Sequence, residues 1–190
     1  MRILSSALMY AGKIKDFVQP VLSSNGTIGG NSFAVRASRK GANNTAYAYR
    51  MFDNNTSTNI LTEDTLGIFI HAGMYNPKPL NITSATINFT ECSGFSITSP
   101  SIAYNFYGTN NQTDFINYFS NSSVEGFEVL KTGTLKPPYN AGSSAELSLE
   151  LPTNTKYYKF HIFSTNLSYE SGAFTGFAIA EIKLNGLERG

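Results

Sequence analysis

The chain of 190 residues has one cysteine, Cys92, and no tryptophan. A single cysteine excludes an intrachain disulfide and any metal site built only from cysteines. Charged residues make up 14% of the sequence, well below the roughly 25% that is usual in soluble domains. The formal net charge is +1 and no basic stripe is present. The sequence therefore predicts no nucleic-acid partner and no strong attraction to a membrane surface.

Long apolar runs and export signals are missing as well. No segment approaches the ~20 consecutive apolar residues that span a bilayer, so we expect no membrane insertion. Residues 1–9 carry one basic residue and too short an apolar stretch for a signal peptide. These absences predict a soluble protein that is made in a reducing cytoplasm.

The common catalytic signatures are also absent. The chain has no Gly-x-Ser-x-Gly, no His-Glu-x-x-His and no phosphate-binding loop. Its two histidines, His71 and His161, both lie in strand-like patterns, where a hydrogen-bonded sheet residue is a more common role than a base or a metal ligand. The carboxylates are scattered, and nothing pairs them for glycoside hydrolysis. We expect no enzymatic activity.

Short alternating runs, separated by Gly, Pro and Asn, dominate the chain from residue 32 onward. The predicted strands span residues 32–38, 66–72, 80–89, 102–107, 127–130, 146–151, 157–164 and 177–184. Within 80–89 the alternation slips by one residue at Thr83-Ser84, as it does at a β-bulge. The only helix-like piece is residues 45–52. The pattern predicts an all-β protein, an antiparallel β-sandwich.

The first part of the chain has a different character. Residues 1–17 are mildly amphipathic, Pro20 ends this stretch, and residues 23–31 are rich in Gly, Ser and Asn. We interpret residues 1–31 as a short N-terminal docking arm with a linker, and residues 32–190 as the sandwich. Its apolar residues are predicted to bury against a partner: Ile3, Leu4, Leu8, Met9, Ile14, Phe17 and Val18.

Five short phrases follow one another along residues 32–184. They are Met51-Phe52-Asp53-Asn54-Asn55-Thr56-Ser57-Thr58, Asn76-Pro77-Lys78-Pro79-Leu80-Asn81-Ile82, Tyr107-Gly108-Thr109-Asn110-Asn111-Gln112-Thr113, Lys156-Tyr157-Tyr158-Lys159-Phe160 and Ala180-Glu181-Ile182. In this order they resemble the discoidin-like domain, a coagulation-factor type C, galactose-binding-like β-sandwich of jelly-roll type. The second and third phrases look like versions found in bacteriophage tail and head fibre proteins. One departure is that Asn59-Ile60 stands where the family has a tryptophan.

The resemblance implies a structural cation such as Ca²⁺, held by Asp53, Asn55, Thr58 and Glu181. Ca²⁺ takes six to eight oxygen ligands from carboxylates, amides and backbone carbonyls. A strand glutamate between apolar neighbours would also be costly to bury without a counter-charge. In the alternative, Asp53 only caps a turn and Glu181 points to water on the outer face of the sheet. The sequence leaves both open.

The resemblance also implies sugar binding by loops at one end of the sandwich, where an aromatic platform works with polar side chains. Our candidate ligand-binding residues are Arg39, Asn43 and Tyr75. With 11 Tyr and 14 Phe in the chain, most rings must lie in the core or on the sheet surface. Only a few of them are therefore available to a ligand.

These observations lead to a non-enzymatic bacteriophage virion protein, a tail or head fibre or a decoration protein, that binds host cell-surface carbohydrate. Its arm would dock to other virion proteins. We expect a homo-oligomer such as a trimer, located in the virion after assembly in the host cytoplasm. One alternative is a purely structural capsid or tail subunit without glycan binding. Another is a carbohydrate-binding accessory domain of a bacterial surface protein or secreted enzyme; the initiating methionine and the missing export signal argue against this one.

Overall fold

The computed structural model describes residues 13–38, 44–58, 60–61, 70–90, 101–135, 145–151, 156–168 and 178–190. The strands in these ranges are β1 (Ile14–Asp16), β2 (Ala34–Ser38), β3 (Ile60–Leu61), β4 (His71–Thr90), β5 (Ser101–Thr109), β6 (Glu128–Leu135), β7 (Ala145–Glu150), β8 (Tyr158–Ser168) and β9 (Ala178–Arg189). A 3₁₀ helix, η2 (Asn44–Phe52), follows β2, and an α-helix, α1 (Gln112–Asn121), follows β5. None of the helices in this part of the chain is long and apolar enough to cross a membrane.

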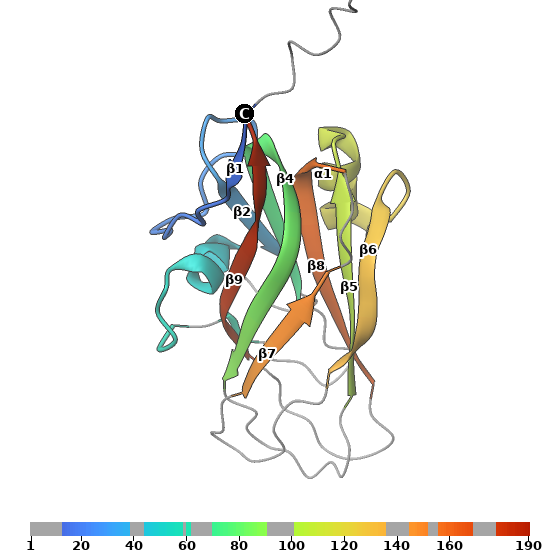
Figure 1. Cartoon of the computed structure of the whole chain (residues 1–190). Coiled ribbons are helices and arrows are strands. Elements are labelled where there is room, and N and C mark those ends of the chain that lie inside the picture. Colours follow the sequence, from blue (N-terminus) through green and yellow to red (C-terminus); the bar gives the residue numbers. More distant parts are fainter. Residues whose placement is uncertain are drawn as a thin grey trace, which may run out of the picture.

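Strand β4 connects two sheets. Residues 71–75 pair with β2 and β8, whereas residues 80–90 pair with β9, and residues 84–89 also pair with β7. The first sheet has the order β2-β4-β8-β5-β6, and the second has β7-β4-β9 with β1 and β3 on the free edge of β9 (Figure 1). Every pairing is antiparallel. The predicted antiparallel β-sandwich is confirmed.

The bend of β4 corrects one detail of the prediction. Pro77 and Pro79 fall between the predicted strands 66–72 and 80–89, but they lie inside β4, where its pairing with β8 breaks between Tyr75 and Leu80. Proline has no backbone N–H to donate, and such a break is where it costs no ladder bond. The predicted bulge is confirmed, because the pairing of β4 with β9 shifts register between Ile82 and Ser84.

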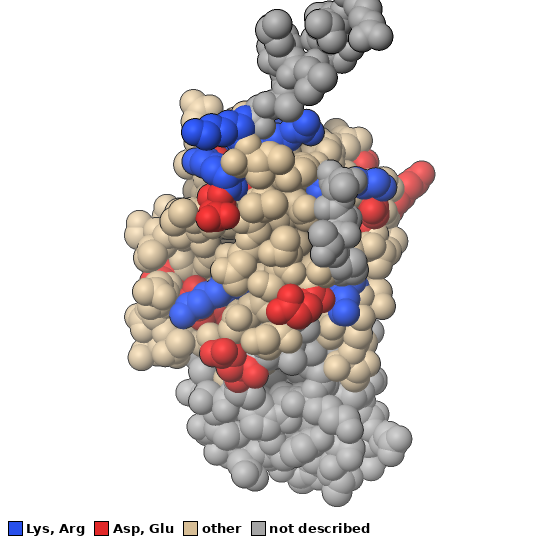
Figure 2. Space-filling model, in the orientation of Figure 1, with Lys and Arg blue, Asp and Glu red and all other residues tan. Residues whose placement is uncertain are grey.

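The sandwich has two distinct ends. Strands β5, β7 and β9 begin, and β4, β6 and β8 finish, at what we call the loop end, where residues 91–100, 136–144 and 169–177 join them. The bend of β4 and the C-terminal residue lie at the opposite end, the terminus end (Figure 1). Uncharged residues cover most of the described surface in the view of Figure 2, and Lys and Arg side chains gather at the terminus end.

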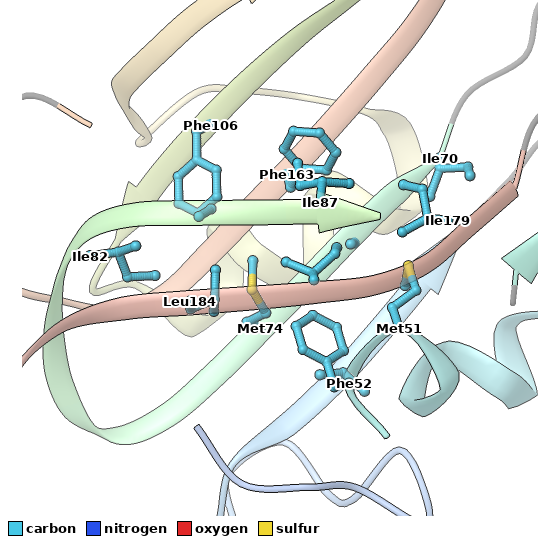
Figure 3. Close-up of a cluster of buried hydrophobic side chains, with 14 of the residues drawn as sticks. Met51, Phe52, Ile70, Met74, Ile82, Ile87, Phe106, Phe163, Ile179 and Leu184 are labelled. Atoms are coloured by element: carbon cyan, nitrogen blue, oxygen red, sulfur yellow. The ribbon is translucent and has the colours of Figure 1, made fainter. Parts of the chain in front are cut away.

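The main hydrophobic core lies between the two sheets. Phe106 and Phe163 project from the first sheet towards Ile87 and Leu184 of the second, and Phe52 of η2 packs at one side (Figure 3). All five side chains are at most 3% exposed. Burying a large apolar side chain contributes about 1.5–3 kcal/mol, so this cluster is the main source of stability for the pairing of the sheets.

A second, smaller core lies under α1 on the outer face of the first sheet. Phe115 and Tyr118 of the helix pack against Tyr75 and Phe160, and all four are buried. A Cβ at Gly73 would lie 2.5 Å from Cζ of Phe119, so only a glycine leaves room for the helix here. The prediction that residues 45–52 form the only helix is therefore wrong.

Residues 13–31 belong to the sandwich. Strand β1 pairs with β9, and the backbone N–H of Phe17 donates to the carbonyl of Gly186. The side-chain amide of Gln19 then takes the place of a strand, since its Nε2 donates to the Ile182 carbonyl at 2.8 Å and its Oε1 accepts from Leu184 N at 2.8 Å. The predicted boundary at residue 31 is therefore wrong for residues 13–31. Residues 1–12 lie outside the described part, so the docking role of the arm stays a prediction.

Candidate functional site

The loop that follows η2 is a tight turn built around one carboxylate. Oδ1 of Asp53 accepts from the backbone N–H of Asn55 at 3.0 Å, and Oδ2 accepts from the hydroxyl of Thr58 at 2.6 Å. The N–H of Thr58 also donates to the Asn55 carbonyl at 3.1 Å. Asn54 has a φ of 55°, in the left-handed region that Asn enters more readily than most residues. Asp53 thus caps the turn, as the alternative to a cation site describes for this residue.

Glu181 comes from β9 and faces this loop. Its side chain is 1% exposed, and it points to the outer face of the second sheet, which the Asp53 loop and residues 17–21 cover. The backbone N–H groups of Asn54 and Asn55 donate to its carboxylate. Its other oxygen, Oε2, has no hydrogen-bond partner. The alternative in which Glu181 points to water is therefore wrong.

The pKa of Glu181 is shifted by burial and by the neighbouring Asp53. Burial, followed by the negative charge of Asp53, raises the pKa of Glu181 to about 7, although the N–H donors of Asn54 and Asn55 and the charge of Lys183 act in the opposite direction. An ionised carboxylate in this position is costly unless a proton or a cation neutralises it. The structure thus brings together two segments that are far apart in the sequence, and the N–H donors and Lys183 offset only part of the cost of placing Glu181 beside Asp53.

The residues around Asp53 and Glu181 offer oxygen ligands of the kind that a hard cation binds. The region supplies the carboxylates of Asp53 and Glu181, an amide side chain and the backbone carbonyls of the turn, and the Oε2 atom of Glu181 has no hydrogen-bond partner. In the described ranges no group of three His, Cys, Asp or Glu side chains gathers in one place, so amide and carbonyl oxygens would have to complete the coordination shell. That mixture of oxygen ligands is the one that Ca²⁺ takes in proteins.

A cleft of about 410 Å³ lies beside Glu181. Its walls come from residues 17–21, from Phe52 and Asn54, and from the stretch of β9 between Glu181 and Asn185. Val18 and Val21 on its rim are strongly exposed, at 83% and 68%. The cleft thus opens beside Glu181, the carboxylate that lines it.

The three predicted sugar-binding residues have different outcomes. Arg39 and Asn43 lie outside the described residues, in the segment that follows β2, a strand that runs towards the loop end. Tyr75 lies within β4, is 7% exposed and has its ring 4.9 Å from that of Phe160. The expectation that Tyr75 lies on a ligand-binding loop is wrong, because the main core and α1 cover the two faces of β4 at this residue. Tyr75 therefore offers no platform to a sugar.

Both histidines are sheet residues, as predicted, and neither lies in the Asp53–Glu181 region. His161 is 1% exposed, its Nε2 has no hydrogen-bond partner, and burial lowers its pKa to about 3. Nδ1 of His71 lies 2.6 Å from the hydroxyl of Tyr118, and burial lowers the pKa of His71 to about 4. Both rings are therefore neutral at pH 7.

Sequence reasoning missed the donors that hold Glu181 in place. They are backbone N–H groups of Asn54 and Asn55, and Gln19 fixes the neighbouring part of β9. No sequence signal points to a backbone donor, and Gln19 lies in the stretch that was interpreted as a docking arm with a linker. Only the packing of residues 13–31 against β9 reveals this support.

Comparisons with known proteins identify the fold. No protein-family model and no curated protein matches the sequence. Among solved structures, the C-terminal domain of a chitobiase from Bacteroides fragilis aligns with a TM-score of 0.50 at 12% identity, over 84% of this chain and 96% of that one. The module CBM32-3 from a family 31 glycoside hydrolase of Clostridium perfringens aligns with a TM-score of 0.48 at 12% identity, over 80% and 90% of the two chains. The family 32 CBM of C. perfringens NanJ, solved in complex with galactose, gives 0.44 at 20% identity, over 81% and 93%.

The last two TM-scores lie below 0.5, so the fold assignment rests on the chitobiase domain and on the strand order. The chain has the discoidin-like, galactose-binding-like β-sandwich fold. Because the sequence identities are only 12–20%, the alignments show a similar fold and leave the ligand open.

Proposed function

We propose that this sandwich is a non-catalytic carbohydrate-binding module, an accessory domain of a bacterial surface or secreted protein. The supporting observation is its fold, a two-sheet sandwich in which the Asp53 loop closes on the buried Glu181. Of the solved structures that align with this chain, one is a CBM32 module of a family 31 glycoside hydrolase, and another is a family 32 CBM in complex with galactose. The accessory-domain alternative fits these neighbours better than the virion role, for which none of the comparisons gives support.

The sugar site belongs, in this proposal, to the loop end. Strands of both sheets begin or end there. Binding sites are commonly built from loops that a rigid scaffold presents. Arg39 and Asn43 follow in sequence after β2, a strand that runs towards this end, and we retain them as the candidate sugar-binding residues. Tyr75 is left out because its ring is buried.

A bound Ca²⁺ between the Asp53 loop and Glu181 is the second part of the proposal. The ion would neutralise the two carboxylates and join the loop to β9. Its role is structural, since the residues of this region stabilise the turn and position η2 rather than present a reactive group. Asp53, Asn55, Thr58 and Glu181 are the residues that would hold it, together with carbonyl oxygens of the turn.

Binding of galactose-containing glycans tests the proposed function. We expect the full chain, in the presence of Ca²⁺, to bind some of these glycans on an array and to show saturable galactose binding in calorimetry. Arg39→Ala should weaken binding about tenfold or more, as expected when a hydrogen bond to a charged group is lost. Arg36→Ala is the matched control, because Arg36 packs over Phe119 under α1, away from the loop end.

Two results would overturn the proposal. One is an absence of glycan binding by the folded, Ca²⁺-saturated chain, which would favour a purely structural subunit. The other is equal loss of binding in Arg36→Ala and Arg39→Ala, which would show that the loop end has no special role.

A further inference from the structure

A second cleft, of about 540 Å³, lies at the terminus end of the sandwich. It is formed where β8 begins, β5 has ended and β9 finishes, and its wall includes Pro79, Asn110, Lys156, Tyr157, Lys159 and Arg189. Three of these side chains are cationic and none is a carboxylate. Lys and Arg side chains gather at this end of the molecule in Figure 2. We call it the basic cleft.

The backbone of the basic cleft is fixed by one amide side chain. Nδ2 of Asn110 donates to the carbonyl of Tyr157 at 3.0 Å, and its Oδ1 accepts from the N–H of Lys159 at 2.9 Å. This double hydrogen bond holds the start of β8 against the end of β5. Tyr158 anchors the same segment from below, since its ring packs over Gly108, where a Cβ would lie 2.6 Å from Cδ2 of the ring. The cleft is therefore present before any ligand arrives.

The acidic residues near the basic cleft are already engaged. Glu128 accepts from Nζ of Lys156 at 2.5 Å and from the Tyr158 hydroxyl at 2.6 Å, and these bonds hold the pKa of Glu128 below its usual value. Glu188 pairs with Lys15 and Lys78, which do not line the cleft.

Two cations of the basic cleft remain available to a ligand. Within the described ranges, neither Lys159 nor Arg189 has a carboxylate partner. The guanidinium of Arg189 lies 5.8 Å from the centre of the Tyr157 ring. The guanidinium of Arg189, with its five N–H donors, and the ammonium of Lys159 thus line the same cleft as the half-buried ring of Tyr157. This combination offers an apolar face and an uncompensated positive charge at the same point.

We propose that the basic cleft is a second binding site, specific for a glycan that carries carboxylate groups, such as a polymer of uronic acid. The Tyr157 ring would contact one face of a pyranose, while Arg189 and Lys159 would bind its carboxylate. A guanidinium matches a carboxylate with two parallel hydrogen bonds. The formal net charge of +1 makes a nucleic-acid backbone the weaker candidate, because such partners need many phosphate contacts. This site is distinct from the loop end and does not depend on the sugar site proposed there.

The test uses the full chain, labelled with ¹⁵N, and tri-galacturonate as the probe. We expect saturable binding, with the largest amide shifts at Asn110, residues 157–159 and Arg189. Fully methyl-esterified tri-galacturonate keeps the pyranose rings but has no charge, and inorganic sulfate has the charge without the rings. Both should bind at least tenfold more weakly. A single-stranded oligonucleotide covers the nucleic-acid alternative.

Variants locate the site. Arg189→Ala should weaken tri-galacturonate binding about tenfold or more, and the fold should survive because Arg189 is exposed next to the last residue. Lys131→Ala in the middle of β6 removes the same charge elsewhere and should leave affinity unchanged. Arg39→Ala should also leave it unchanged, even if that variant loses galactose.

Each other outcome contradicts the proposal. Equal affinity for sulfate would show an unspecific anion site, and tighter binding of the oligonucleotide would show a nucleic-acid site. Shifts that avoid residues 157–159, or binding that Arg39→Ala abolishes, would place the glycan at the loop end. No binding of tri-galacturonate would refute the second site while leaving galactose binding at the loop end as a separate result.

Discussion

Strand β9 passes through two regions that accommodate charge in opposite ways. Near its start, Glu181 is buried beside Asp53 with one oxygen unpaired. Near its end, Glu188 pairs with Lys15 and Lys78, and Arg189 is exposed beside the basic cleft. A buried charge must be neutralised by a proton, a cation or hydrogen bonds, whereas water and salt compensate an exposed one. Changes in the first region should therefore alter stability, and changes in the second should mainly alter binding.

His161 extends the comparison, because it is a second polar group that the interior holds in its neutral form. Its ring lies about 6 Å from the rings of Phe106 and Tyr158, at 6.1 and 6.0 Å between centroids. Protonation would place a charge in this aromatic environment, and no carboxylate of the described residues pairs with it. Because the interior disfavours the protonated form of His161, we expect acid to destabilise the folded protein.

The largest expected effect is a loss of unfolding free energy at acidic pH, and it follows from His161. Its folded-state pKa of about 3 lies below the ordinary 6.5, so between these pH values the unfolded chain binds a proton that the folded chain does not. Stability must then fall as the pH falls through this window. Each pKa unit corresponds to about 1.4 kcal/mol, so the loss from His161 amounts to several kcal/mol. His71 acts in the same direction, and Glu181 in the opposite one.

Comparison with His161→Leu isolates the contribution of this residue. We expect urea unfolding between pH 7 and pH 4 to show a steeper loss of stability in the wild type than in His161→Leu. The absolute stability of the variant at pH 7 does not matter to this difference. Parallel pH profiles for the two proteins would show that His161 is not held neutral by burial.

A smaller effect is expected at the other end of β9. Burial raises the pKa of Glu188, but hydrogen bonds from Lys15 and Asn76 and the charges of Lys15 and Lys78 outweigh it, so the net pKa lies below the usual value. The stability that this group contributes is present above its unfolded pKa and is lost as the pH falls through the folded one. Glu188→Gln should cost about 1 kcal/mol at pH 7.

Salt distinguishes this surface network from the interior. The cost of Glu188→Gln should shrink between about 0.1 M and about 1 M NaCl, because salt screens exposed charges over short distances. Glu146→Gln on β7 is the matched control, since Glu146 is exposed and has no salt bridge within the described residues. A cost of several kcal/mol that is independent of salt would place Glu188 with the interior instead.

The two regions also differ in how far the sequence predicts them. Alternation of apolar residues located most of the strands and even the slip at Thr83-Ser84, because a half-buried strand has a period of two that shows in the sequence. The closeness of Asp53 and Glu181 came from the resemblance alone, since no local pattern connects two segments so distant in the chain. The structure brings them together and leaves the cation untested.

Helix α1 shows what local reasoning could have found. Asn111 caps it, accepting from the N–H of Thr113 at 2.9 Å, and Asp114 lies in its first turn. Phe115, Tyr118 and Phe119 follow with helical spacing, and residues 112–121 have no Gly or Pro. These signals predict a helix over residues 112–121 from the sequence alone.

The basic cleft had no such signal. Its residues come from four separate places in the chain, which are Pro79, Asn110, residues 156–159 and Arg189. Each of them is of a type that is common on protein surfaces. Only the register of β4, β8 and β9, which brings Leu80 opposite both Tyr158 and Glu188, places them together. A site of this kind follows from topology rather than from a motif.

Calorimetric titration with CaCl₂ tests most directly the claim that the Asp53 loop and Glu181 form a cation site. The protein is first treated with a chelator, and the wild type is compared with Glu181→Gln and with the exposed control Glu150→Gln. We predict saturable binding of one Ca²⁺ to the wild type and to Glu150→Gln, and none to Glu181→Gln. No binding to the wild type, or equal binding to all three proteins, would contradict the account and leave a proton to neutralise Glu181.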